Sequence, residues 1–140
     1  MNKIPLEDRL EIQELVARYA FFSDTAQYEK IEQVFAEDGV FNESVLGMPV
    51  TSGRAAIRDL FMQSGDTITW LIHLNCNHQI SEFHGDSASG MSHLHAEGAL
   101  NGDPFRILGY YADDYVRVDG RWLLKHRKLV LIAPLVGFGT

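Results

Sequence analysis

Residues 109–129, GYYADDYVRVDGRWLLKHRKL, decide the fold of this chain. Two runs of alternating side chains flank the dipeptide Asp119-Gly120, which favours a tight turn between strands. The alternating positions are Tyr111, Asp113, Tyr115 and Arg117 before the turn, and Trp122, Leu124, His126 and Val130 after it. Alternate residues of a strand point to opposite faces of its sheet. The stretch therefore predicts an antiparallel hairpin.

The same alternation extends back to Thr67. Turn-forming residues separate its segments at Gly85-Asp86 and at residues 101–104, Asn-Gly-Asp-Pro. In the first segment an apolar row alternates with a polar row. The apolar row is Ile68, Trp70, Ile72, Leu74 and Cys76, and the polar row is Thr69, His73, Asn75 and Asn77. The second half of the chain therefore predicts a meander of long antiparallel strands, with the last residues, 137–140, expected to fray.

Helical spacing dominates the first half of the chain. Apolar residues recur every three or four positions from Pro5 to about Asp24, and again over residues 27–35. We expect a short strand at residues 40–43 and a third helix at residues 52–62, capped by the Ser52 side chain. Helices followed by antiparallel strands indicate an α+β fold, with three N-terminal helices packed on a strongly curved sheet.

Composition narrows the classes of function. A chain of 140 residues with 46% apolar content suits one domain, spanning residues 1–140. Cys76 is the only cysteine, so neither an internal disulfide nor a Cys-based zinc site can form. A formal charge of −7 without a Lys/Arg run argues against nucleic acid as a partner. No apolar stretch approaches the ~20 residues of a membrane span, so we expect a cytoplasmic protein with no membrane partner.

Four stretches of the sequence together carry a family resemblance. They are residues 14–41 (ELVARYAFFSDTAQYEKIEQVFAEDGVF), 52–61 (SGRAAIRDLF), 72–77 (IHLNCN) and 109–129. Their order and spacing resemble the SnoaL-like branch of the nuclear transport factor 2-like superfamily over nearly the whole chain. The resemblance implies a cone-shaped α+β fold, a pocket for a small hydrophobic substrate or ligand, no cofactor, and a homodimer paired through the outer sheet face.

The resemblance also implies site residues. Scytalone dehydratase and the bile-acid dehydratase place a Tyr and an Asp late in the first helix, opposite a strand His. Tyr19, Asp24 and His73 match those positions. Glu43 stands roughly where the ketosteroid isomerases carry their base carboxylate. A second histidine of scytalone dehydratase has no match, because its strand offers Gly98 here.

These residue types suit an elimination reaction. Abstraction of a proton next to a carbonyl needs a base that is active near neutral pH, which an imidazole side chain can supply, and His73 is the candidate. Asp24 can orient that imidazole and stabilise it once it is charged. Tyr19 can donate its phenolic hydrogen to the carbonyl oxygen as enolate charge develops. Loss of a β-hydroxyl would complete a dehydration, which predicts a cofactor-independent lyase that acts on a small apolar carbonyl or aromatic compound.

Two other functions stay open at this point. An isomerase could use Glu43 to shuttle a proton and Tyr19 to polarise the carbonyl, and the domain could also bind a small molecule, or serve as an accessory subunit, without catalysis. Each site residue also has a structural interpretation, since Asp24 suits a helix end and Tyr19 a buried stripe. The two are five residues apart, so both converge on one site only if the helix ends or kinks near Ser23.

Other polar side chains have plainer interpretations. His93, His95 and Glu97 share one strand face and could hold a divalent metal if His78 or His84 approached, but a solvated or subunit-facing surface is the preferred interpretation. The residues with the YxDxY pattern are interpreted as sheet and interface positions, and His126 and Arg127 as structural. Trp70 or Trp122 is expected at a dimer contact. The residues that fall into the YxDxY group are Tyr111, Asp113, Tyr115 and Arg117.

Overall fold

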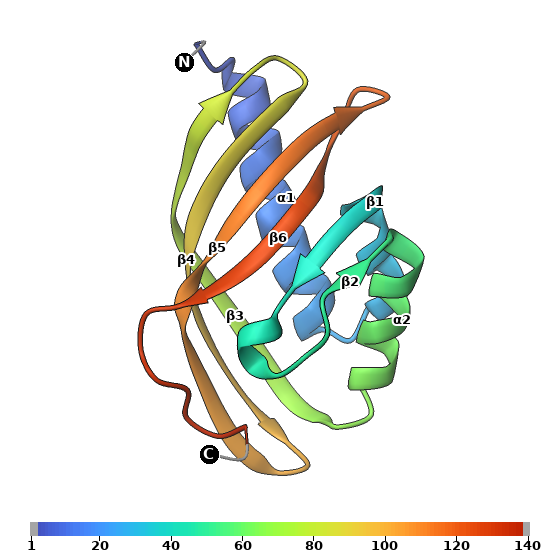
Figure 1. The fold of residues 1–140 in the computed structure, drawn as a ribbon, viewed down its shortest axis with the longest axis vertical. Coiled ribbons are helices and arrows are strands. Elements are labelled where there is room, and N and C mark those ends of the chain that lie inside the picture. Colours follow the sequence, from blue (N-terminus) through green and yellow to red (C-terminus); the bar gives the residue numbers. More distant parts are fainter. Residues whose placement is uncertain (1–2, 139–140) are drawn as a thin grey trace.

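The computed structural model describes residues 3–138 and has the expected α+β class, with helices packed on a six-stranded mixed sheet (Figure 1). The helical segments in this range are the α-helices α1 (Leu6–Asp24) and α2 (Arg54–Ser64) and the short 3₁₀ helices η1 (Tyr28–Gln33) and η2 (Ser44–Leu46). The strands are β1 (Phe35–Asn42), β2 (Thr51–Ser52), β3 (Ile68–Phe83), β4 (Ser87–Leu100), β5 (Asp103–Val118) and β6 (Arg121–Leu131). Over residues 3–138, no helix has the length and apolarity that crossing a bilayer requires.

The sheet has the strand order β2-β1-β6-β5-β4-β3. All neighbouring strands are antiparallel except β1 and β6, which run parallel. Tight turns join β3 to β6 in sequence, and the turn residues Asn101 and Asp119 adopt positive φ angles of 50° and 51°, each followed by a glycine. The predicted meander is therefore confirmed. Strand β3 lies at one edge of the sheet, and no strand formed by residues 3–138 pairs with its outer side.

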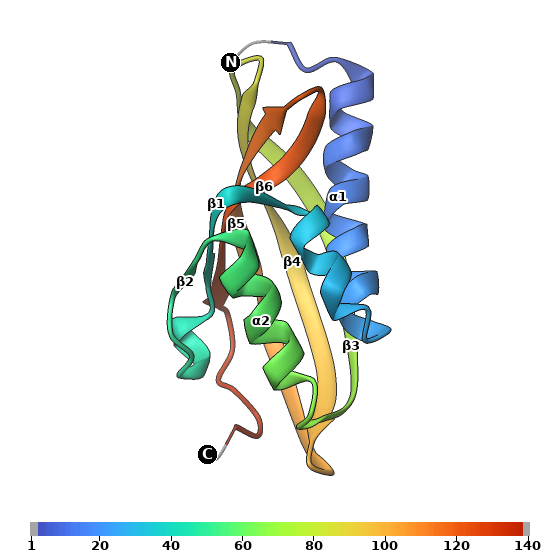
Figure 2. The same cartoon turned by 90° about the vertical axis from the view of Figure 1, so that its right-hand side faces the viewer.

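Helix α1 lies across one face of the sheet, and α2 lies beside β1 on the same side (Figure 2). Helix α1 contacts both β3 and β6, so it spans the width of the long strands. Its residues Ile12, Leu15, Val16 and Tyr19 are buried against the sheet, as their spacing predicts. The helix ends at Asp24, next to Ser23. An end at this point is what Tyr19 and Asp24 need if both side chains are to reach the same site.

The structure differs from the expected three N-terminal helices at the second one, whereas the third follows a strand, as predicted. The second segment is a short 3₁₀ helix, and β1 begins directly after it at Phe35, earlier than the expected start at Val40. Pairing with β6 explains the early start, because Leu124 donates its backbone N–H to Val34 O at 2.8 Å. The third helix, α2, follows β1 and β2 in the chain.

The predicted cap of α2 is also wrong. Ser52 lies in β2, and the residue that precedes the helix is Gly53, whose side chain can supply no hydrogen bond. Gly53 has φ 95° and ψ 134°, a conformation that side-chain-bearing residues rarely adopt. Its N–H donates to Gly39 O at 2.7 Å and its carbonyl accepts from Ile57 at 3.0 Å. The turn into α2 therefore depends on backbone conformation.

Hydrophobicity favours burial of the apolar face of β3, but in the structure most of this face is exposed. From Trp70 on, the apolar row points outward, where Trp70 is 51% exposed and Ile72 and Leu74 are also exposed, while His73 points inward and lines the cavity with Ile68. Trp122 is 1% exposed and lies in the core, so it cannot contribute to a dimer contact. The expected homodimer stays a prediction.

The C-terminal segment packs back on the sheet. Val136 pairs with Arg106 through two backbone hydrogen bonds, and the Phe138 ring lies 4.8 Å from the Phe105 ring, centroid to centroid. The expected fraying is therefore wrong for residues 137–138, and residues 139–140 lie outside the described residues. Phe138 helps to enclose the cavity described next.

The entry into α2 generates a stability prediction. We expect Gly53→Ala to lower the free energy of unfolding by about 1–3 kcal/mol, because alanine is strained at this φ and ψ. Ser52→Ala should change it by less than about 0.5 kcal/mol, because Ser52 forms no cap. Urea titrations of the two variants measure these changes. If Ser52→Ala lowers the free energy of unfolding more than Gly53→Ala does, Ser52 caps the helix after all.

Candidate active site

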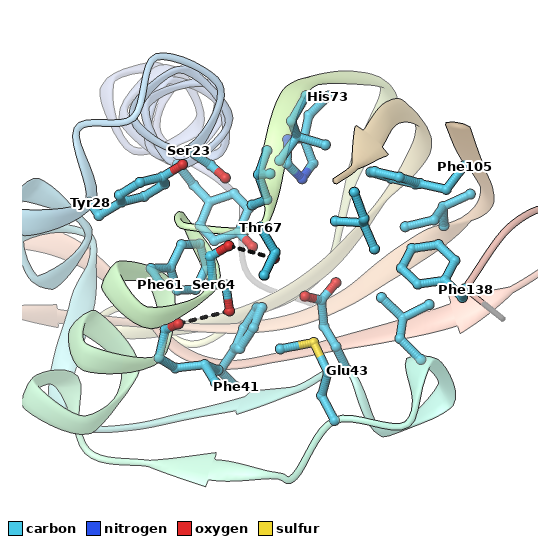
Figure 3. Close-up of a pocket in the computed structure, with 18 residues that line it drawn as sticks. Ser23, Tyr28, Phe41, Glu43, Phe61, Ser64, Thr67, His73, Phe105 and Phe138 are labelled. Carbon is cyan, nitrogen blue, oxygen red and sulfur yellow. Dashed lines mark hydrogen bonds between the residues drawn. The ribbon is translucent and has the colours of Figure 1, made fainter. Parts of the chain in front are cut away.

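A cavity of about 300 Å³ lies between the helices and the inner face of the sheet (Figure 3). Its walls are mostly apolar, with aromatic rings from α2, β1, β5 and the C-terminal segment. These rings belong to Phe41, Phe61, Phe105 and Phe138. Three ionisable groups predicted for the site, Tyr19, Glu43 and His73, line this cavity together. An apolar cavity with a few polar groups is typical of a small-molecule site.

Asp24 and His73 form a hydrogen-bonded pair. Asp24 Oδ1 lies 2.6 Å from His73 Nδ1, and Asp24 Oδ2 accepts the backbone N–H of His73 at 2.8 Å. The second bond uses a donor that is free because β3 is an edge strand. In the tautomer in which His73 donates from Nδ1 to Asp24, the Nε2 lone pair is available to a ligand. The pairing predicted from sequence is therefore present in the geometry.

Tyr19 and Asp24 reach His73 from different sides of α1. Asp24 does not line the cavity but holds His73 from behind, whereas Tyr19 lines the cavity and its ring lies 5.9 Å from the His73 ring. Burial, helped by the neighbouring Tyr111 hydroxyl and Glu43, raises the pKa of Tyr19 well above its usual value. Tyr19 is therefore protonated at neutral pH and can act only as a neutral hydrogen-bond donor or acceptor.

A buried ion pair lies beneath Tyr19. Arg127, which is 0% exposed, donates from Nε and Nη2 to the two oxygens of Asp113 at 2.9 and 2.8 Å. Its guanidinium lies 4.4 Å from the ring centre of Tyr19 and 3.9 Å from that of Tyr111. Burial alone would lower the pKa of Arg127, but Asp113 outweighs burial and raises it. The arginine is therefore a fixed positive charge behind the cavity wall.

Glu43 presents its carboxyl group to the cavity (Figure 3). Burial raises its pKa from 4.5 to about 7, although His73 and Arg127 both act in the opposite direction. No hydrogen bond from residues 3–138 to this side chain stabilises its charged form. A carboxyl group with such a pKa holds a proton in about half of the molecules at neutral pH and can act as an acid or a base.

Sequence reasoning missed the interior role of the YxDxY residues. Tyr111, Asp113 and Tyr115 are buried, so they are not interface positions, and Tyr115 donates its hydroxyl to Asp113 at 3.0 Å. Arg127 is structural, as predicted, but it also acts electrostatically on Glu43. The sequence signal that could have found this pair is the alternation on both sides of the Asp119-Gly120 turn. Asp113 and Arg127 lie opposite each other on β5 and β6 when the two strands of this hairpin pair.

The outer sheet face carries the remaining histidine cluster. His95 Nε2 lies 3.3 Å from Glu97, while His93 contacts Asn77 at 3.0 Å, and both histidines are exposed. Within residues 3–138, no three His, Cys, Asp or Glu side chains gather closely enough to hold a metal ion. His93, His95 and Glu97 therefore do not assemble the site that their spacing raised as an alternative.

Comparison with known proteins defines the class of this chain. The SnoaL-like domain family model matches residues 5–128, and the chain belongs to this family, within the nuclear transport factor 2-like superfamily. No curated protein shows significant similarity to it. Among solved structures, a candidate aromatic ring hydroxylase from Novosphingobium aromaticivorans is 28% identical, with a TM-score of 0.91 over 96% of each chain.

Two more solved structures share the fold at lower identity. A candidate scytalone dehydratase from Novosphingobium aromaticivorans is 22% identical, with a TM-score of 0.84 over 94% of this chain and 87% of that one. A hexachlorocyclohexane dehydrochlorinase, LinA-type3 from Novosphingobium barchaimii, is 19% identical, with a TM-score of 0.82 over 94% and 91%. At such identities the likeness extends to the fold alone.

The raised pKa of Glu43 predicts a pH dependence of stability. Between pH 4.5 and about 7 the unfolded chain releases the Glu43 proton while the folded chain retains it. The free energy of unfolding should therefore fall by about 3 kcal/mol across this window, relative to Glu43→Gln, and then level off. Urea titrations at several pH values measure this difference. If the free energy of unfolding depends on pH in the same way in the wild type and in Glu43→Gln, the prediction is wrong. Glu29→Gln, at an exposed position, is the matched control.

Proposed function

We propose that this protein is a cofactor-independent lyase, a dehydratase that removes water from a small, largely apolar carbonyl or aromatic compound. The observation that carries the proposal is the 2.6 Å pair between Asp24 and His73 beside a mostly apolar cavity. An apolar cavity excludes water, which strengthens each polar interaction made inside it. A base in such a place suits the removal of a proton from carbon.

His73 supplies the base in this proposal. Its Nε2 takes a proton from the carbon next to the carbonyl, while Asp24 keeps Nδ1 protonated and stabilises the imidazolium that forms. Asp24 accepts hydrogen bonds from both the backbone and the ring of His73, which limits rotation of the imidazole. Tyr19 stays protonated and offers a hydrogen bond to the oxygen on which negative charge develops.

Glu43 supplies the acid. The electron pair of the broken C–H bond forms a carbon–carbon double bond, the C–O bond breaks, and the departing hydroxyl takes the Glu43 proton and leaves as water. One proton then has to pass from His73 back to Glu43 to restore the starting state. The pKa of about 7 supports this role, because an ordinary glutamate would be almost fully ionised at neutral pH.

An isomerase is the second candidate, and Glu43 is the observation that favours it. In that reaction Glu43 removes a proton as a carboxylate and returns it to another carbon, while Tyr19 polarises the carbonyl. The third possibility, a domain that binds a small molecule without turnover, would use the same cavity. The hydrogen-bonded Asp24 and His73 favour the lyase, because neither alternative needs a base dyad.

The names of the fold relatives agree with an elimination. One is called a dehydratase and another a dehydrochlorinase, and both names describe loss of a small molecule from neighbouring carbons. The hydroxylase name belongs to a protein with higher identity. One fold hosts several reactions, so the proposal rests on the site and not on these names.

A screen of β-hydroxy-carbonyl and hydroxylated ring compounds tests the proposed lyase. Mass spectrometry of the products should reveal loss of water, whereas an isomerase would leave the mass unchanged. We expect His73→Ala to lower kcat/KM by about 10²–10⁴-fold and Asp24→Asn by a smaller factor. Exposed His84→Ala is the control and should be as active as the wild type. If His73→Ala is as active as the wild type, His73 is not the base.

The pH profile of kcat/KM separates the two enzymatic candidates. As the acid of a dehydratase, Glu43 must carry its proton, so activity should fall as pH rises above about 7. As the base of an isomerase it must be ionised, so activity should rise through the same pH. In Glu43→Gln this limb of the profile should disappear in both cases. If the change of kcat/KM near pH 7 persists in Glu43→Gln, it arises from the titration of another group.

A further inference from the structure

The two ends of the cavity differ in chemistry. Hydroxyl groups of Ser23, Tyr28, Ser64 and Thr67 gather at the end formed by α1, η1 and the connection from α2 to β3. Figure 3 draws this end on the side of Ser23 and Tyr28, with the Phe105 and Phe138 rings on the opposite side. His73 and Glu43 lie between the two ends in the same view.

Two of the four hydroxyls are already engaged. Ser64 Oγ donates to Leu60 O at 2.8 Å, and Thr67 Oγ1 donates to Ser64 O at 2.9 Å. Ser23 and Tyr28 make no side-chain hydrogen bond with any of residues 3–138. Ser23 is only 4% exposed, yet its side chain faces the cavity. A hydroxyl that has lost bulk water and gained no protein partner is a binding group for whatever enters.

Gly65 holds Tyr28 in this position. A Cβ atom built on Gly65 would lie 2.4 Å from Cε2 of the Tyr28 ring. The Gly65 backbone is right-handed helical, with φ −57° and ψ −30°, so glycine is needed here for space and not for conformation. Partial burial raises the pKa of Tyr28, so its hydroxyl keeps its proton. The ring thus packs on a backbone surface that only glycine leaves open.

Ser23 lies next in sequence to Asp24, the residue that holds the proposed base, His73, so the hydroxyl-rich end of the cavity is close to the base. Ser23 and Asp24 are the last two residues of α1 and point in different directions. Ser23 faces the cavity, and Asp24 holds the His73 imidazole. One helix end therefore carries both a free hydroxyl and the partner of the base, so a ligand oxygen bound at Ser23 would set the distance of the rest of the ligand from His73.

We propose that Ser23 and Tyr28 form a subsite for an uncharged oxygen of the ligand, a hydroxyl or a carbonyl, on a mono- or bicyclic hydrocarbon that packs against Phe105 and Phe138. As a specificity device for turnover, the subsite rests on the proposed lyase function. No Lys or Arg side chain among residues 3–138 lines the cavity, and Glu43 is acidic, so a carboxylate ligand would lack a counter-charge. The substrate class is therefore an uncharged, oxygenated ring compound.

Binding of two unreactive probes tests the subsite without turnover. The probes are 2-naphthol and naphthalene, which differ by one hydroxyl, and fluorescence titration gives the Kd of each. The measured quantity is the ratio of the naphthalene Kd to the 2-naphthol Kd. The cost of removing each probe from water is the same for every variant, so changes in this ratio report contacts made by the hydroxyl.

Ser23→Ala and Tyr28→Phe each remove one hydroxyl and keep the surrounding shape. We expect each to lower the ratio about fivefold, the effect of one neutral hydrogen bond, while naphthalene binding changes little. Gly65→Ala should lower the ratio with both hydroxyls still present, because its Cβ displaces the Tyr28 ring. Tyr110→Phe on the outer sheet face is the control and should leave the ratio unchanged. Circular dichroism and Tm confirm folding of each variant.

The outcomes separate the subsite from the lyase. A ratio that does not change in Ser23→Ala and Tyr28→Phe overturns the subsite, even if turnover depends on His73. An equal fall in Tyr110→Phe also overturns it. A ratio that falls as expected while no hydroxylated compound is turned over supports the subsite and overturns the lyase, leaving a domain that binds oxygenated ring compounds.

Discussion

The buried ion pair between Arg127 and Asp113 is the constraint on which the interior depends. A charged guanidinium inside a protein is tolerated only if it is paired and well hydrogen-bonded, and both of its bonds here reach one carboxylate. Asp113 and Arg127 are register partners on β5 and β6, and the guanidinium provides the surface on which the Tyr19 and Tyr111 rings rest. The pair therefore connects the two strands to the Tyr19 ring of α1 at the cavity wall.

The edge of the sheet explains how His73 is held. An edge strand leaves backbone N–H groups unpaired, and a carboxylate is a strong acceptor for such a donor. Asp24 at the end of α1 satisfies the N–H of His73 and bonds its imidazole at the same time. One side chain thus docks the helix on the strand and sets the ring orientation, which couples the fold directly to the chemistry of the site.

Two carboxylates near His73 are placed in contrasting surroundings. Asp24 accepts two hydrogen bonds, whereas Glu43 is half-buried without a hydrogen-bond donor among residues 3–138, and desolvation raises its pKa to about 7. A hydrogen-bonded carboxylate such as Asp24 suits an orienting group, whereas a carboxyl group with a raised pKa such as Glu43 suits a proton donor. Between them the cavity remains apolar enough for the hydroxyls of Ser23 and Tyr28 to matter to a ligand.

The sequence by itself determined the α+β class, the meander and the course of α1, because period and turn residues are local signals. The family resemblance named Tyr19, Asp24, Glu43 and His73 as site residues, but the sequence left open whether they converge. It did not determine which face of β3 points inward, since alternation of Trp70, Ile72 and Leu74 with His73 is the same from either side. It also misplaced the cap of α2, where Gly53 acts through its φ angle, and it placed Tyr111, Asp113 and Tyr115 at an interface although they are buried. Those features were decided only by the tertiary structure, because they depend on which strands become neighbours and on what lies opposite each side chain once the sheet has formed.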